Sequence, residues 1–110
     1  MAGASFNIRV PNFVTHDKVG DYFIIELEKG GFKLYYNDVY EIYSTIDFRK
    51  SGFKYNLVIV QKDGRLDISA SVYCNLASLF APRKRVQQQD YFNDCVKRIL
   101  SGYPGIAILN

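Results

Sequence analysis

The sequence predicts an α+β fold. We expect an antiparallel β-sheet of about five or six strands, one main helix over about residues 86–101 packed on one face, and a short final strand. Three observations predict it: strand-like runs of β-branched and aromatic residues recur between residues 5 and 74, an Asp-Gly pair separates two of them, and helical spacing is clear near the C-terminus. A chain of 110 residues predicts a single globular domain, 1–110.

The strongest local signal is a β-hairpin over residues 53–74. Asp63-Gly64 lies between two strand-like runs, and Asp-Gly tolerates the positive φ angles of a two-residue type I′ turn. Pairing Lys62 with Arg65 sets the register and places alternate residues of both arms on one face. That face is almost wholly apolar, so we expect it to be core: Tyr55, Leu57, Ile59 and Gln61 lie opposite Val72, Ala70, Ile68 and Leu66. The other face should be partly wetted.

The N-terminal third predicts a strand, a loop and a second hairpin. Residues 5–10 alternate apolar and polar side chains, and Pro11 ends that run. Residues 11–20 are expected to form a loop. Residues 22–28 have an apolar centre followed by alternation, which predicts a second strand. Lys29-Gly30-Gly31 then predicts a tight connection to a third strand over residues 32–36.

The segment 37–49 is compatible with two structures. As a helix it has a cap at Asn37 or Asp38 and apolar residues at helical spacing. As a strand it places Tyr40, Ile42, Ser44, Ile46 and Phe48 on one face. Valine, tyrosine, isoleucine, threonine and phenylalanine dominate the segment and lose rotamer freedom in a helix, so a strand is favoured.

The C-terminal third predicts the main helix and the closing strand. Residues 75–81 are short and apolar and could form one helical turn before Pro82. In the helix that follows, apolar side chains recur on one side and Gly102 ends it. Residues 105–110 form an apolar closing strand. It needs a neighbour, either the sheet of its own domain or a second copy of the chain.

Charge, cysteines and termini restrict the function classes. The net charge of +3 is concentrated after residue 50, where eight Lys/Arg face four Asp/Glu, and this permits a phosphate-bearing partner. Cys74 and Cys95 have no metal-ligand spacing and are expected to be free thiols in a reducing compartment. The N-terminus lacks the features of a signal peptide and no run is long enough to span a membrane, so an intracellular location, cytoplasmic or nuclear, is expected.

The residues offer little support for catalysis. His16 is the only histidine, and as a loop residue it is expected to be solvated. The carboxylate pairs Glu26/Glu28 and Asp63/Asp67 fit a wet strand face and a turn. No glycine-rich phosphate loop or nucleophile motif occurs. We therefore expect no enzyme activity, no catalytic residues, no metal and no cofactor.

Two basic clusters are the candidate binding residues. Arg49, Lys50 and Lys54 alternate with aromatic residues at a hairpin corner, and Arg83, Lys84 and Arg85 precede the main helix. Clustered cations attract phosphates. The residue types alone favour the alternative, in which the aromatic residues are core and the cations are ordinary solubilising loop residues. Three cations at a helix N-terminus oppose the macrodipole, which an anionic partner would relieve.

Tyr35 and Tyr36 occupy adjacent strand positions and should point to opposite faces, so at least one reaches the outer surface. The first hypothesis is a non-enzymatic module that binds single-stranded nucleic acid through these tyrosines and the two basic clusters. The alternative is a protein-interaction or self-assembling accessory domain, of viral or other origin, that pairs with a partner or forms a homo-oligomer through the aromatic sheet surface and the C-terminal strand.

Overall fold

A computed structural model, which describes residues 3–73 and 82–109, confirms the α+β fold. All strand pairs are antiparallel and form one six-stranded sheet in the order β2-β3-β4-β5-β1-β6. The elements are β1 (Gly3–Arg9), α1 (His16–Lys29), β2 (Lys33–Val39), β3 (Tyr43–Lys50), β4 (Phe53–Lys62), β5 (Arg65–Tyr73), α3 (Pro82–Ser101) and β6 (Ala107–Ile108).

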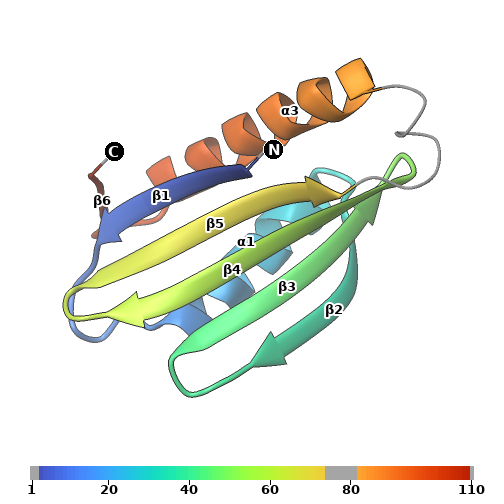
Figure 1. The fold of residues 1–110 in the computed structure, drawn as a ribbon. Coiled ribbons are helices and arrows are strands. Elements are labelled where there is room, and N and C mark those ends of the chain that lie inside the picture. Colours follow the sequence, from blue (N-terminus) through green and yellow to red (C-terminus); the bar gives the residue numbers. More distant parts are fainter. Residues whose placement is uncertain (1–2, 74–81, 110) are drawn as a thin grey trace.

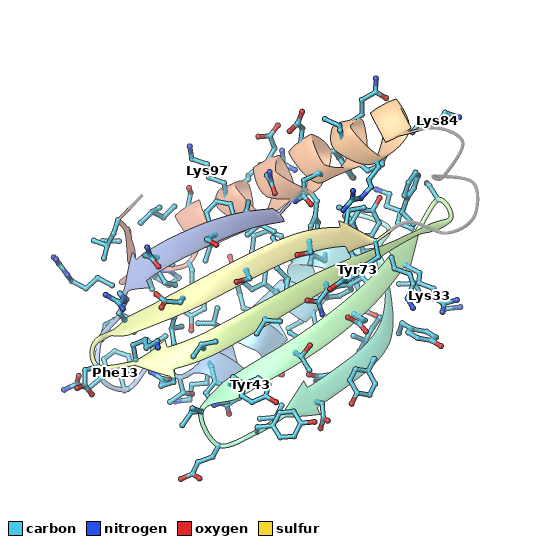
Figure 2. All side chains as sticks on the ribbon, viewed as in Figure 1. Phe13, Lys33, Tyr43, Tyr73, Lys84 and Lys97 are labelled. Atoms are coloured by element: carbon cyan, nitrogen blue, oxygen red, sulfur yellow. The ribbon has the colours of Figure 1, made fainter. Side chains whose placement is uncertain are left out.

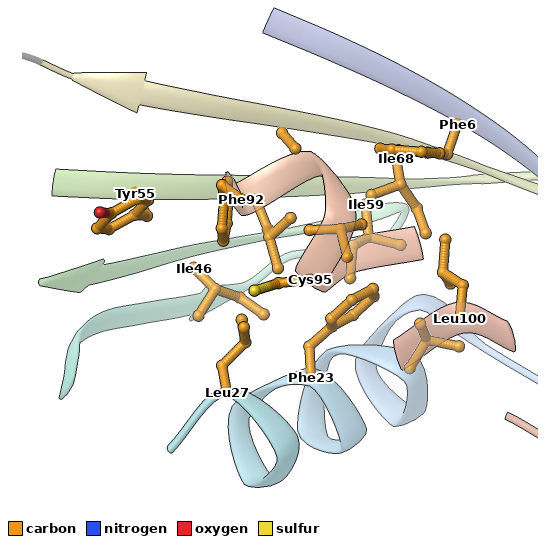
Figure 3. Close-up of a cluster of buried hydrophobic side chains, with 14 of the residues drawn as sticks. Phe6, Phe23, Leu27, Ile46, Tyr55, Ile59, Ile68, Phe92, Cys95 and Leu100 are labelled. Atoms are coloured by element: carbon orange, nitrogen blue, oxygen red, sulfur yellow. The ribbon is translucent and has the colours of Figure 1, made fainter. Parts of the chain in front are cut away.

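Both helices cover the same face of the sheet. In Figure 1 the strands lie in front, α1 passes behind them, and α3 runs along the upper edge. Figure 3 shows side chains of both helices meeting the strands in one core, with Phe23 of α1 and Phe92 of α3 among them. In the part of the chain that the structure describes, no helix covers the opposite face. We call this opposite surface the open face.

The central hairpin has the predicted register, but its turn differs. Lys62 pairs with Arg65 and Ile59 with Ile68. Leu57, Ile59, Leu66 and Ile68 are fully buried, as expected for the core face. Gly64 has a φ of 63°, whereas Asp63 does not have a positive φ. The turn is therefore not type I′, which requires positive φ at both central residues, but it keeps the predicted length of two residues, which together with the side-chain pattern sets the register.

The prediction for residues 16–28 was wrong. Helix α1 replaces the expected end of the loop and the expected second strand, so Glu26 and Glu28 lie on a helix. Its buried positions follow helical spacing: His16, Val19, Gly20, Phe23 and Leu27. The local run of isoleucine and aromatic residues favours a strand. Burial of this helical stripe against β3 and β4 outweighs that preference.

His16 is also not the solvated loop residue that we expected. It begins α1 and is 5% exposed. Its ring nitrogens lie 2.6 Å from Ser44 Oγ and 3.0 Å from the carbonyl oxygen of Glu41. Its backbone N–H donates to Gln61 Oε1. These contacts join the start of α1 to β3 and to the β2–β3 turn, which explains the burial of a polar ring.

The ambiguous segment is extended, and the C-terminal elements are shifted. Residues 37–39 end β2, and residues 43–49 lie in β3 with Ser44, Ile46 and Phe48 buried. The main helix begins at Pro82, four residues before the expected start. The closing strand is only the two residues of β6. The helical turn expected over residues 75–81 and Cys74 lie outside the described residues.

Two further expectations have a partial answer. Cys95 is buried and its thiol is free. No helix within residues 3–73 and 82–109 combines the length and the apolar character that crossing a lipid bilayer requires.

Candidate nucleic-acid interface

A row of three cations and a tyrosine crosses one end of the open face. Lys33 of β2 lies opposite Arg49 of β3, Arg49 lies opposite Lys54 of β4, and Lys54 lies opposite Tyr73 of β5. Partners in an antiparallel pair project from the same face, so all four side chains belong to the open face. All four are exposed. We call this set, Lys33, Arg49, Lys54 and Tyr73, the first row.

The first row holds like charges directly opposite one another, which destabilises a sheet. Two ion pairs are formed in the described part of the chain, Lys29–Glu26 and Arg65–Asp67, and neither involves this row. Among the described residues the compensation is aromatic: the Arg49 guanidinium lies 3.8 Å from the centre of the Tyr35 ring and the Lys54 ammonium lies 5.8 Å from it. An anion bound here would relieve the repulsion.

The β3–β4 turn creates a hollow beside the first row. Ser51 and Gly52 have φ angles of 54° and 81°, the two positive values of a type I′ turn. This tight turn keeps β3 and β4 in register up to their ends, where Arg49 and Lys54 lie. The hollow has a volume of about 460 Å³ and is lined by Lys33, Arg49, Lys50, Ser51, Gly52, Phe53 and Lys54.

A β-bulge in β2 corrects the expectation for Tyr35 and Tyr36. The register of β2 with β3 shifts between Leu34 and Tyr36, so Tyr35 is the extra residue. Tyr36 lies opposite Asp47 on the open face, and the ring of Tyr35 meets Arg49 on that same face. Both rings are exposed, 57% for Tyr35 and 47% for Tyr36. The bulge therefore brings two adjacent tyrosines to one surface, whereas simple alternation separates them.

Tyr36 belongs to a separate aromatic group around Asp38. The hydroxyls of Tyr36 and Tyr40 both donate to Asp38 Oδ2. The Tyr40 ring stacks on Tyr43, with the ring centres 4.6 Å apart. The hydrogen bond to Asp38, and then its negative charge, raise the pKa of Tyr40 to about 12, and the same bonds lower the pKa of Asp38. The carboxylate makes this part of the face less favourable for phosphate.

Lys50 lines the hollow, but its ammonium group is directed toward the helices. Lys50 Nζ donates to the carbonyl of Gly30, at 2.7 Å, and to the Tyr91 hydroxyl, at 2.6 Å. It also lies 4.7 Å from the centre of the Phe32 ring. Gly30 follows the last residue of α1, where cations stabilise the exposed carbonyls. Lys50 therefore links α1, β3 and α3.

The second predicted cluster lies at the same end of the sheet. The side chain of Arg83 lies outside the part that the structure describes. Lys84 is exposed, and Arg85 Nε donates to the carbonyl of Val72, one residue before Tyr73 of the first row. Figure 2 shows Lys84, Tyr73 and Lys33 toward the same end of the molecule. The cluster occupies the first turn of α3 and does not precede the helix, because the helix begins at Pro82.

The structure thus brings together Arg49, Lys54 and Tyr35 among the predicted residues. Sequence reasoning missed Lys33 and Tyr73. Tyr73 could have been found, because the predicted hairpin register continues by one residue to pair it with Lys54. Lys33 could not, because its partner Arg49 depends on the β2–β3 pairing beyond the bulge.

Comparisons of the chain with protein-family models, with curated proteins and with solved structures found no match.

Proposed function

We propose that this chain is a non-enzymatic module that binds single-stranded nucleic acid across the first row of its open face. The observation that carries the proposal is the run of three directly opposed cations, Lys33, Arg49 and Lys54, without a carboxylate partner among the described residues. Such an arrangement is unfavourable unless an anion binds there. Phosphates that contact these cations release counterions, which favours association.

The tyrosines favour nucleic acid over other anions. Tyr35 and Tyr73 lie beside the cations and are 57% and 52% exposed. Exposed aromatic rings stack on unpaired bases, at roughly 1–3 kcal/mol for each base. The Arg49 guanidinium already lies over Tyr35, so part of this platform is ordered before a ligand binds. Cations beside stacking rings fit a strand whose bases are unpaired.

The test is binding of a labelled single-stranded oligothymidylate to the wild-type chain and to the double variant Arg49→Ala/Lys54→Ala across a range of salt concentrations. We expect the wild type to bind more weakly as salt rises. The variant should lose most of its affinity at low salt. The slope of log affinity against log salt should fall by about 0.7 for each phosphate contact removed.

Lys97→Ala is the matched control, because Lys97 is an exposed lysine on α3, away from the open face. It changes the net charge as one first-row substitution does and should bind like the wild type. If Lys97→Ala weakens binding as much as Lys54→Ala, the attraction is a general charge effect and the proposed site is wrong. Absence of binding by the wild type at low salt would show that the proposed function is wrong.

Self-assembly through the C-terminal strand has less support. β6 has two residues, which pair with Ile8 and Arg9 of β1, and the Leu109 N–H that follows donates to the carbonyl of Asn7. A free edge of that length presents few backbone groups to a further strand.

A further inference from the structure

A second row of cations crosses the opposite end of the open face. Arg65 of β5 lies opposite Arg9 of β1 and also opposite Lys62 of β4. All three side chains are exposed. Arg65 forms an ion pair with Asp67, at 3.1 Å, which leaves Arg9 and Lys62 without a carboxylate partner among the described residues. We call Arg9, Arg65 and Lys62 the second row.

The two rows share one surface and are far apart. Lys54 of the first row and Lys62 of the second lie on the same strand and, an even number of residues apart, on the same face. At about 3.4 Å per residue, eight residues of β4 separate their Cα atoms by roughly 27 Å. A stacked single strand rises about 3.4 Å per nucleotide, so this separation corresponds to about eight nucleotides, and to fewer if the strand is extended.

The surface between the rows is suited to bases and not to phosphates. Strand β4 presents Asn56, Val58 and Val60 there, and all three are half-buried. The surface between the rows therefore consists of short, partly apolar side chains. Asn56 donates to Asp47 Oδ1 at 2.6 Å. Asp47, which forms no ion pair among the described residues, gives this middle zone negative charge, which repels a phosphate. Ser69 and Ser71, which lie opposite Val58 and Asn56, carry hydroxyls that can donate to base edges, and the valines can contact base faces.

We infer that one continuous nucleic-acid strand runs parallel to the β-strands, with phosphates held at both rows and unpaired bases over the middle zone. This inference rests on the proposed function and adds the direction and the length of the bound strand. It assigns Lys62 and Arg9 to the binding site. A ligand too short to reach the second row makes contacts at the first row only.

The experiment measures affinities of two oligothymidylates, of about 4 and about 12 nucleotides, within the range that single domains of this size occupy. The wild type should bind the longer oligomer more tightly than its larger number of possible binding positions alone would explain. Lys62→Ala should weaken binding of the longer oligomer several-fold and leave the shorter one unchanged. Lys54→Ala should weaken both. Lys97→Ala should weaken neither.

The outcomes separate the inference from the function on which it rests. If Lys54→Ala weakens both oligomers and Lys62→Ala weakens neither, the strand does not reach the second row; the inference is overturned and the proposed function stands. If inorganic polyphosphate of similar length shows the same pattern at equal affinity, bases make no contact and the middle zone is assigned wrongly. If neither oligomer binds the wild type, both proposals fail.

Discussion

Individual polar residues join the layers of this protein at positions where the sequence suggests surface residues. His16 and Lys50 both come from segments that are locally hydrophilic, and each contacts three elements or turns. His16 connects α1 with β3 and β4 at one end of the sheet, and Lys50 connects α1, β3 and α3 at the other. These contacts matter because a polar group that is removed from water without a hydrogen-bond partner costs about 1–3 kcal/mol.

Replacement of Lys50 by methionine tests the structural role of this lysine. The variant keeps the aliphatic stem but loses the bonds to the Gly30 carbonyl and the Tyr91 hydroxyl. We expect the free energy of unfolding in urea to fall by about 1–2 kcal/mol, as for charge-assisted hydrogen bonds at a partly exposed site. Lys97→Met, on the exposed side of α3, should change it by less than about 0.5 kcal/mol. Equal stability of the two variants would contradict the role of Lys50 as a link.

Asp38 and Tyr40 predict an observable titration. The pKa of Tyr40 is about 12, above its ordinary value of 10.0, so its contribution to stability is complete below pH 10 and is lost as the pH rises toward 12. In Asp38→Asn the charge is absent, and Tyr40 should ionise closer to pH 10. Ultraviolet absorbance of tyrosinate follows this change.

Tyr55, whose pKa burial raises to about 12, serves as the internal reference for that titration. Its late ionisation should persist in Asp38→Asn. In Tyr40→Phe one late ionisation should be missing. An unchanged absorbance curve for Asp38→Asn would show that the carboxylate does not hold the Tyr40 hydroxyl in solution.

The position of helix α1 depends on a small residue, Gly20, at its contact with the sheet. Gly20 faces the sheet, and a Cβ there would lie 3.2 Å from Ile46 Cδ1 and 3.8 Å from Ile59 Cδ1. The helix can therefore approach β3 and β4 closely, which brings Phe23 and Leu27 into the core. A side chain larger than methyl at this position would hold the helix away from the sheet.

Gly20→Leu should therefore destabilise the protein by about 1–3 kcal/mol through overpacking, measured by chemical denaturation. Gly20→Ala should be nearly neutral, because the gain of about 1 kcal/mol in helix propensity opposes the tight contact with Ile46. Glu28→Leu places the same side chain on the exposed side of α1 and should have little effect. If Gly20→Leu and Glu28→Leu are equally stable, α1 does not pack on the sheet at this point.

The whole molecule has two unlike sheet surfaces, one buried under α1 and α3 and one open. The buried surface follows from alternation, because apolar residues at every second position of β3, β4 and β5 demand a cover. The open surface has cations at its two ends and carboxylates between them, although the net charge is only +3. The spatial separation of these charges, more than their sum, decides what can bind.

The fold class, the central hairpin and the main helix could be predicted because each has a short-range signal. Gln61 and Leu66 pair across a turn only a few residues long. The apolar positions of α3 recur from one helical turn to the next. The start of α1 and the faces of Tyr35 and Tyr36 could not be predicted in this way. Strand propensity competes with helical spacing over 22–28, and one extra residue in β2 changes which side chains share a face.

The residues of β4 and β5 that face the core follow from local sequence, since period-two alternation and a two-residue turn leave one register. Tertiary structure alone decided that residues 16–29 form a helix, because only the apolar face of the assembled sheet can bury that stripe. It also decided that Lys33 lies beside Arg49 and Lys54, because the bulge in β2 sets which residues of β2 and β3 are paired.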